Sequence, residues 1–298
     1  MPTFPCRWQD LAWTEFAGLD PRTTVAVLPV AAVEQHGPHL PLDVDARINA
    51  GLLAAALDLA PANLPVLVLP TQTVGTSAEH AAFPGTLSLS PATLACVWTE
   101  LASSVRAAGV RKLLILNSHG GQGALARVVA QDLRSRLSML VAVANTYAFG
   151  EPEGLFPDRE RLHGVHAGAI ETSLMLHLAP DAVRHASIDC FHPASIDLEV
   201  SNRELRYHGR VTLAWATQDL HHSGACGDAT LGCADAGRRI IEHAAPRLAC
   251  LLAELSACPL EALRLGPLEG REAPDAWRAS GDAQAAGRAP PADTPSSR

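Results

Sequence analysis

The amino-acid sequence predicts an α/β fold with a mainly parallel central β-sheet. Four apolar runs of strand length, rich in Val, Leu and Ile, alternate with longer segments of helical pattern. Short, near-continuous apolar runs are typical of strands buried on both faces, and helices connect such strands in α/β folds. The chain has 298 residues, of which 48% are hydrophobic and 18% charged, and this is enough to bury a core of that kind.

The four predicted strands lie in the first half of the chain. They cover residues 24–30, 66–69, 112–117 and 140–145. Each run is shorter than a typical helix and is dominated by apolar residues. Because helical segments separate them, we expect the strands to run in the same direction.

Three helices are predicted between these strands. They cover residues 46–59, 91–108 and 123–137. The second has the clearest beginning, because Ser90 is a suitable N-cap and Pro91 occupies the first helical position.

The second half of the chain gives a more mixed pattern. We predict a loop over residues 150–164, a helix over 167–178, a further strand over 211–216 and a long helix over 228–255. From residue 272 the chain is rich in Ala, Pro, Gly, Ser and Asp, a composition typical of disorder. The simplest division is one domain of residues 1–271 and a disordered tail of residues 272–298.

Charge and cysteine content limit the class of protein. The net charge is −8 and no basic cluster occurs, which argues against nucleic acid or an anionic membrane as a partner. Seven scattered cysteines, without a C-x-x-C pair, favour a reducing compartment over a disulfide framework. No secretory signal or membrane-spanning stretch is recognised. We therefore expect a soluble, cytoplasmic protein.

Side chains of the metal-binding type crowd the segment that follows the first predicted strand. Glu34 and His36 lie two residues apart, so in extended chain they point to the same side. They stand at the carboxyl end of a strand, where open α/β sheets bind ligands. Asp45 precedes the next helix and would either bind a metal or cap that helix. Nitrogen and oxygen donors at this density predict a divalent-metal site and a hydrolytic enzyme.

A second candidate segment follows the third predicted strand. His119 is succeeded by Gly120 and Gly121, and glycines let the backbone approach a ligand closely. Such a turn can also be a plain tight turn or a phosphate-binding nest. The lysine of a Walker motif is absent, which weakens the phosphate interpretation.

The remaining candidates lie farther along the chain. His166 precedes a predicted helix that carries Glu171, and from this segment alone Glu171 reads more readily as a surface charge than as a ligand. Glu79 and His80 lie in a loop bounded by Gly and Pro, which is either beside a site or an ordinary surface loop.

Taken together, several motifs resemble the creatininase (creatinine amidohydrolase) family. They are Glu34-x-His36, Asp45, Asn117-x-His119-Gly-Gly, Phe83-Pro84-Gly85-Thr86, His166-Ala-Gly-x-x-Glu171-Thr-Ser and Ser223-Gly-Ala-Cys-Gly-Asp228. The resemblance covers residues 25–254. It implies a three-layer α/β/α fold, two divalent metal ions per subunit (Zn, Mn or Fe) and, commonly, a homohexamer.

The resemblance also implies a ligand set. Glu34, Asp45 and His119 would hold one metal, while His36, Asp45 and a glutamate would hold the other. Creatininase proper places that glutamate two residues after the His of the third strand, where this chain has Gly121. We expect Glu171 to supply the carboxylate, as in the His-Gly-Gly members of the family, the formamide hydrolase and mycofactocin peptidase type, which this chain resembles more than creatininase proper.

The resulting hypothesis is a metal-dependent amidohydrolase. A hydroxide bridging the two metals would attack a non-peptide C–N bond in a small amide, cyclic amide or formamide. His166 is the first candidate for the acid that protonates the leaving nitrogen, and Glu171 is the second predicted catalytic residue. The alternatives are a peptidase acting on a small modified peptide and an inactive metal-binding scaffold. Phosphoester hydrolysis ranks lower, because Arg47 is the one cation near the ligand motifs.

Overall fold

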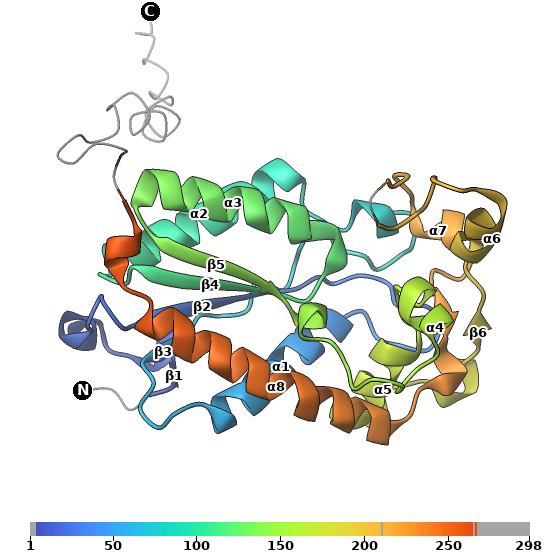
Figure 1. Cartoon of the computed structure of the whole chain (residues 1–298), viewed down its shortest axis with the longest axis horizontal. Coiled ribbons are helices and arrows are strands. Elements are labelled where there is room, and N and C mark those ends of the chain that lie inside the picture. The colour runs from blue at the N-terminus through green and yellow to red at the C-terminus, as the bar shows by residue number, and fades with distance from the viewer. Residues whose placement is uncertain (1–3, 210, 265, 267–298) are drawn as a thin grey trace, which may run out of the picture.

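A five-stranded parallel sheet forms the centre of the molecule. The computed structural model describes residues 4–209, 211–264 and 266, so the predicted disordered tail of residues 272–298 lies outside the described residues. The strand order is β1-β3-β2-β4-β5, and every neighbouring pair is parallel (Figure 1). The strands are β1 (Cys6–Arg7), β2 (Val25–Val30), β3 (Val66–Val68), β4 (Lys112–Asn117) and β5 (Leu140–Asn145). The four predicted strands are confirmed, and β1 is an addition.

Helices cover both faces of this sheet, which confirms the three-layer α/β/α fold. On one face lie α2 (Pro91–Ala107) and α3 (Gly123–Leu137) (Figure 1). On the other face lie α1 (Val44–Leu59) and α8 (Ala234–Ala257), against which α5 (Ala169–Leu178) packs. The predicted N-cap of α2 is confirmed, since the Ser90 side chain accepts a hydrogen bond from the Thr93 backbone N–H.

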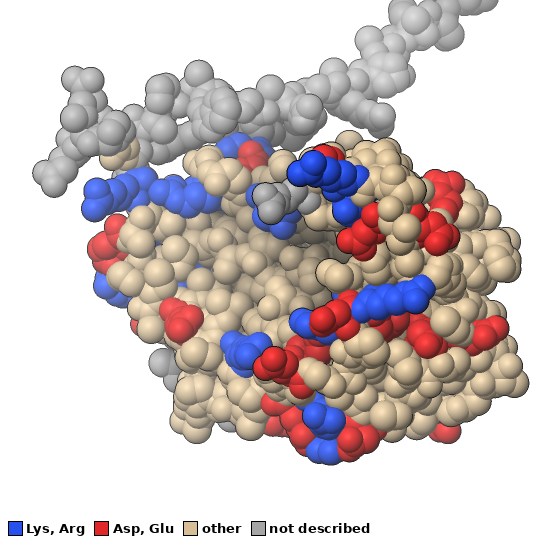
Figure 2. Space-filling view, turned by 45° about the vertical axis from the view of Figure 1, so that its right-hand side comes forward, with Lys and Arg blue, Asp and Glu red and all other residues tan. Residues whose placement is uncertain are grey.

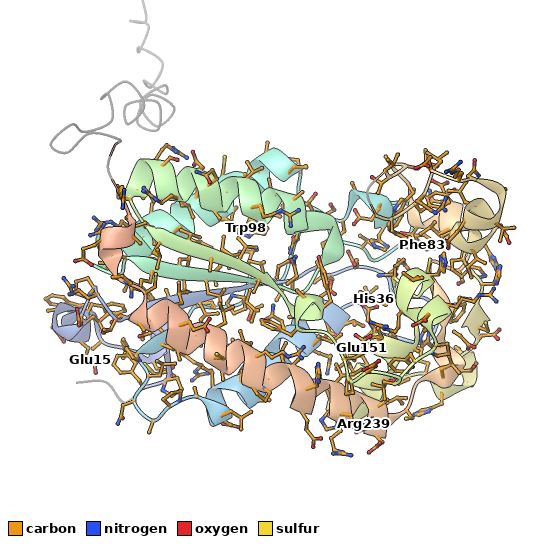
Figure 3. All side chains as sticks on the ribbon, in the orientation of Figure 1. Glu15, His36, Phe83, Trp98, Glu151 and Arg239 are labelled. Carbon is orange, nitrogen blue, oxygen red and sulfur yellow. The ribbon has the colours of Figure 1, made fainter. Side chains whose placement is uncertain are left out.

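Two apolar cores fill the spaces between the layers. Successive residues of β2 alternate between them, because side chains of a strand point to opposite faces of the sheet. Val25 and Val27 enter the core under α1 and α8, whereas Ala26 and Leu28 enter the core under α2 and α3. Trp98 of α2 is fully buried in the second core, as its position between helix and sheet in Figure 3 illustrates.

The second half of the chain is built from shorter elements. The predicted loop of residues 150–164 contains α4 (Asp158–His163), and two further helices are α6 (Ala194–Ser201) and α7 (Thr217–Leu220). Strands β6 (Cys190–Phe191) and β7 (Gly227–Asp228) form a small antiparallel sheet. Short 3-10 turns occur at Trp8–Asp10, Trp13–Gly18, Ala78–His80, Gly120–Gln122, Thr146–Phe149, Pro180–Ala182, His185–Ser187, Ala229–Leu231 and Leu260–Ala262.

Besides the loop of residues 150–164, whose last part is helical, two predictions for this half are wrong. Residues 211–216 form no strand, and a single bridge between Thr212 and Arg206 is their one ladder contact within the described residues. The side chain of Val211 is 52% exposed, so the apolar run there has no sheet to pack on. The last helix begins at Ala234 rather than at residue 228, because Asp228 instead caps a 3-10 turn by accepting from the Thr230 N–H.

The parallel sheet brings several connecting segments to one edge. The loops after β2 and β4 and the first turn of α1 all start from the carboxyl ends of central strands, and this is the usual ligand-binding edge of an α/β sheet. Figure 3 shows His36 in this region, beyond the ends of the central strands. Within the described part of the chain, no helix combines the length and apolar character needed to cross a membrane.

Candidate metal centre

The five predicted metal ligands meet at this edge of the sheet. Glu34 and His36 come from the loop after β2, Asp45 from the first turn of α1, His119 from the end of β4 and Glu171 from the first turn of α5. Among the described residues they take part in three groups of possible ligands, in each of which the donor atoms lie within 4.8 Å of one another. Two groups consist of predicted ligands alone: Glu34 with Asp45 and His119, and His36 with Asp45 and Glu171. Asp45 belongs to both of these, and the third group joins Glu34 and His36 with His166.

The distances between donor atoms suit shared ions. His119 Nδ1 lies 3.1 Å from Glu34 Oε1 and 3.8 Å from Asp45 Oδ2. His36 Nε2 lies 3.8 Å from Asp45 Oδ1 and 3.9 Å from Glu171 Oε2. Two donors at about 2.1 Å from one tetrahedral ion are about 3.4 Å apart, close to these values. Most of these pairs are too far apart to hydrogen-bond directly.

Buried polar atoms without hydrogen-bond partners also indicate a metal centre. Among the described residues, Glu34 Oε2, His36 Nε2 and Asp45 Oδ2 are buried and have no hydrogen-bond partner. Leaving such atoms unsatisfied costs free energy, so several of them pointing at one place need an explanation. A pair of divalent cations would satisfy all three, and these oxygen and nitrogen donors therefore fit a metal centre.

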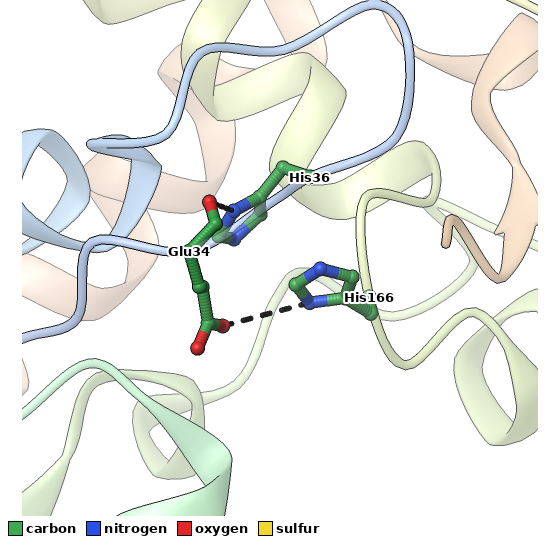
Figure 4. Close-up of side chains that lie close together, drawn as sticks. All are labelled: Glu34, His36 and His166. Atoms are coloured by element: carbon green, nitrogen blue, oxygen red, sulfur yellow. Dashed lines mark hydrogen bonds and ion pairs between the residues drawn. The ribbon is translucent and has the colours of Figure 1, made fainter. Parts of the chain in front are cut away.

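Backbone carbonyls orient the imidazole rings. His119 Nε2 donates to the Thr76 carbonyl at 2.9 Å, and His36 Nδ1 donates to the Glu34 carbonyl at 3.1 Å. In each ring the other nitrogen then carries its lone pair toward the site, as metal-binding histidines require. His166 follows the same pattern: Nε2 donates to the Gln35 carbonyl at 2.6 Å, and Nδ1 lies 3.9 Å from Glu34 Oε1 (Figure 4).

The charges of the site depend on these neighbours. Burial opposes ionisation of Glu34 and His119, but their mutual attraction outweighs it, so the Glu34 pKa is lowered and the His119 pKa is raised to about 10. Burial and the nearby Glu34 carboxylate raise the pKa of Asp45 well above its usual range. Burial lowers the pKa of His36, and it lowers that of His166 to about 4.

Both predicted catalytic residues, His166 and Glu171, lie in the site. The Ala167 N–H donates to Glu171 Oε2 at 2.5 Å, which fixes the carboxylate beside the turn that carries His166. Reading Glu171 as a surface charge is therefore wrong, because helix α5 points its first turn at His36. The signal in that segment is ambiguous, since a carboxylate in a first helical turn is common at surfaces too.

The turn that carries these two residues is braced by a buried carboxylate from α4. Glu160 accepts hydrogen bonds at 2.7 Å from the backbone N–H groups of Ala169 and Asp228. Its carboxylate fits between three glycines, at each of which an added Cβ would lie 2.2–2.6 Å from Glu160 Oε1: Gly164, Gly168 and Gly227. Sequence reasoning missed Glu160, since its partners are backbone groups distant along the chain.

The loop containing Glu79 and His80 also lies beside the site. His80 is buried, with Nε2 3.4 Å from Glu34 Oε1 and Nδ1 accepting from Gln35 Nε2 at 2.7 Å. His80 can thus donate to the Glu34 carboxylate and orient it. The sequence alone left this loop between two interpretations, and the contact with Glu34 decides for the site. Another histidine, His221, hydrogen-bonds to Ser223, and the possible ligand groups in the described ranges do not include it.

A cavity of about 700 Å³ opens above the ligand residues. Four of the predicted ligands, Glu34, Asp45, His119 and Glu171, line it, and so do Tyr147, Arg161 and Trp215. Figure 2 shows this side of the molecule, where a largely uncharged hollow is bordered by acidic and basic residues. The apolar part of its lining includes Ile48, Leu52, Ile170, Leu174, Ile240 and Ile241.

Comparison with known proteins identifies related sequences. The Creatininase family, described as creatinine amidohydrolase, matches residues 9–252. The mycofactocin precursor peptide peptidase of Mycolicibacterium smegmatis is 32% identical over 218 residues, which are 72% of this chain and 79% of that protein. Its namesake in Mycobacterium tuberculosis is 33% identical, over 72% of this chain and 78% of that protein. Creatinine amidohydrolase of Pseudomonas putida is 29% identical, over 58% and 72%.

Solved creatininase structures share the fold. A crystal structure of creatinine amidohydrolase superimposes with a TM-score of 0.66 at 23% identity, covering 83% of this chain and 96% of that one. A creatininase structure with Mn gives a TM-score of 0.66 at 22% identity, over 83% and 97%. A creatininase mutant of Zn–Zn type gives 0.65 at 23% identity, over 83% and 96%.

Proposed function

Because this chain belongs to the creatininase family of hydrolases, we propose that it is a two-metal amidohydrolase that cleaves a C–N bond in a small amide. The observation that carries this proposal is the position of Asp45, whose carboxylate is common to the two groups of possible ligands that consist of predicted ligands alone. A shared carboxylate is the arrangement that two-metal hydrolytic sites use to hold their ions close together.

Two ions are proposed for this centre. Glu34, Asp45 and His119 would hold one, and His36, Asp45 and Glu171 the other. Bound there, the ions would lower the pKa of a shared water to about 7 and polarise the amide carbonyl. Oxygen and nitrogen donors without a thiolate suit Zn, Mn or Fe.

His166 is placed to move the proton. Its Nε2–H is committed to the Gln35 carbonyl, so the lone pair on Nδ1 faces the site. Nδ1 would take a proton from the attacking water and deliver it to the leaving nitrogen. Its lowered pKa of about 4 keeps the ring neutral at pH 7, so the Nδ1 lone pair is unprotonated before the water attacks. His166 thus acts as a base before it acts as the predicted acid.

Two substrate classes fit the cavity. The first is a non-peptide amide, cyclic amide or formamide. The second is a short modified peptide, and the volume of about 700 Å³ with its apolar wall favours it, since so large a cavity takes ligands well above the size of a formamide. The names of the two mycobacterial relatives point the same way.

The test combines metal analysis with a hydrolysis screen. The chain, loaded with Zn, Mn or Fe, is assayed on creatinine, hydantoins, lactams, formamides and short peptides. Asp45→Ala should abolish activity and most bound metal, whereas Asp43→Ala should keep both. Asp43 is the matched control, because its half-exposed carboxylate pairs with Arg47 at 2.8 Å outside the ligand groups. A fully active Asp45→Ala enzyme would exclude the two-metal scheme, and a wild-type chain without metal would favour the inactive scaffold.

The homohexamer implied by the resemblance and the cytoplasmic location expected from the sequence are part of the same proposal. Light scattering on the purified chain tests the first, and fractionation of the native host tests the second.

A further inference from the structure

Glu79 extends its carboxylate into the cavity from the 3-10 turn Ala78–His80. The side chain is 18% exposed, and the residue lines the cavity beside the ligand His119. Glu79 Oε1 lies 3.4 Å from His119 Nε2. That nitrogen already donates to the Thr76 carbonyl at 2.9 Å, so His119 is oriented without help from Glu79. The possible metal-ligand groups of the described residues do not include Glu79.

Gly121 lies next to the Glu79 carboxylate. A Cβ added to Gly121 would lie 1.9 Å from Glu79 Oε1 and 2.7 Å from His119 Nε2. A Cβ added to the adjacent Gly120 would meet nothing within 4 Å. Neither glycine is among the positive-φ positions, so the backbone conformation does not require glycine at either. Gly121 is therefore the position where the lack of a side chain makes room for the Glu79 carboxylate.

A carboxylate that faces a cavity recognises hydrogen-bond donors. In an amide substrate the donors lie on the nitrogen side of the scissile bond, whereas the carbonyl oxygen is only an acceptor. We propose that Glu79 is a substrate-contacting residue whose carboxylate accepts a hydrogen bond from the N–H group of the scissile amide, and that Gly121 admits it. This inference rests on the proposed amidohydrolase function and adds a residue that selects amides over esters.

The first test compares an amide and an ester with the same acyl group, the amide being the best one in the screen. Glu79→Gln should lower kcat/KM for the amide by about 10-fold, because the neutral amide oxygen of Gln is a weaker acceptor than the charged carboxylate. The ester has no N–H group, so its kcat/KM should fall by less than about threefold, within the effect of an ordinary surface change. Bound metal should stay at the wild-type level.

The second test is a double-mutant cycle. Gly121→Ala should lower amide hydrolysis at least as much as Glu79→Ala, since the methyl group displaces the carboxylate and also meets His119. The double variant should be no worse than Gly121→Ala within about twofold, because two changes that remove one contact are not additive. Gly120→Ala is the control, because it measures how much kcat/KM for the amide falls when a methyl group is added to the same turn away from Glu79.

Several outcomes would overturn the inference. Equal losses on amide and ester would show that Glu79 does not contact the amide nitrogen. Loss of metal from Glu79→Gln would make Glu79 a ligand instead. Additive losses in the cycle would separate Gly121 from Glu79. If the metal-loaded wild-type chain hydrolyses neither substrate, the proposed function itself fails; if it hydrolyses both and Glu79→Gln is unaffected, only the role of Glu79 fails.

Discussion

The sheet region, residues 24–145, and the later region, residues 146–233, build the site in different ways. Glu34, Asp45 and His119 lie just beyond paired strands or in the first turn of a long helix. His166 and Glu171 instead depend on a turn held by Glu160 through backbone N–H groups. Ligands placed by a sheet edge follow from local sequence order, whereas the later ones depend on contacts between distant segments. The two regions should therefore respond differently to mutation.

The largest effect is expected from the sheet region. His119→Ala removes a ligand from the group that also contains Glu34 and Asp45. We expect kcat/KM to fall at least about 1000-fold, equivalent to about 4 kcal/mol of transition-state stabilisation. Metal analysis should show loss of at least one ion. His243→Ala, on α8 but outside the ligand groups and the cavity lining of the described residues, serves as the control. Near-normal activity of His119→Ala would show that catalysis does not need this ligand group of the sheet region.

The sheet region should also dominate folding stability. Trp98→Ala empties a fully buried site between α2 and the sheet and should cost about 3–5 kcal/mol in the free energy of unfolding. Trp13→Ala, at a residue 85% exposed, should change it by less than about 0.5 kcal/mol. Denaturant titration measures both. Comparable losses for the two variants would contradict the assignment of the core.

In the later region, we expect a substitution that replaces one oxygen of Glu160 to lower activity. Glu160→Gln puts an amide N–H₂ against a backbone N–H, which should shift the beginning of α5 and with it Glu171. We expect activity to fall about 10- to 100-fold, the usual cost of losing an outer hydrogen bond at a metal site. The ion that we propose for the group of Glu34, Asp45 and His119 should remain. Glu199→Gln, an exposed carboxylate paired with His163, is the control in the same region. Loss of both ions together would show that the regions do not separate.

The smallest predicted effect is a difference in proton release. Without metal, His119 has a pKa of about 10 and carries a proton at pH 7, whereas burial lowers the pKa of His36 and leaves it neutral. Binding to the His119 group must displace that proton, so metal affinity should rise as pH increases toward 10. Calorimetry in two buffers of different ionisation enthalpy should detect about one or more protons released per chain. A metal affinity that does not change between pH 6 and pH 9 would contradict a protonated His119 in the metal-free protein.

The same contrast explains what the sequence could predict. Apolar runs revealed the parallel strands, and polar residues right after them revealed Glu34, His36 and His119. The run at residues 211–216 has the same composition but no neighbouring strand to pair with, so composition alone misled. The relation of Glu79 to Gly121 was invisible because it depends on two loops meeting in space. Glu171 needed the resemblance to a family, since its own segment fits a surface helix equally well.

The sharing of Asp45 has a consequence for the integrity of the molecule as well as for its chemistry. One ion would tie the loops after β2 and β4 to α1, and the other would tie α1 to α5 in the later region. The metals would then act as a cross-link between the two regions. Because ligands that bind only the folded state stabilise it by mass action, thermal unfolding should depend on free metal concentration. Chelation would thus loosen the later region from the sheet before it unfolds the sheet itself.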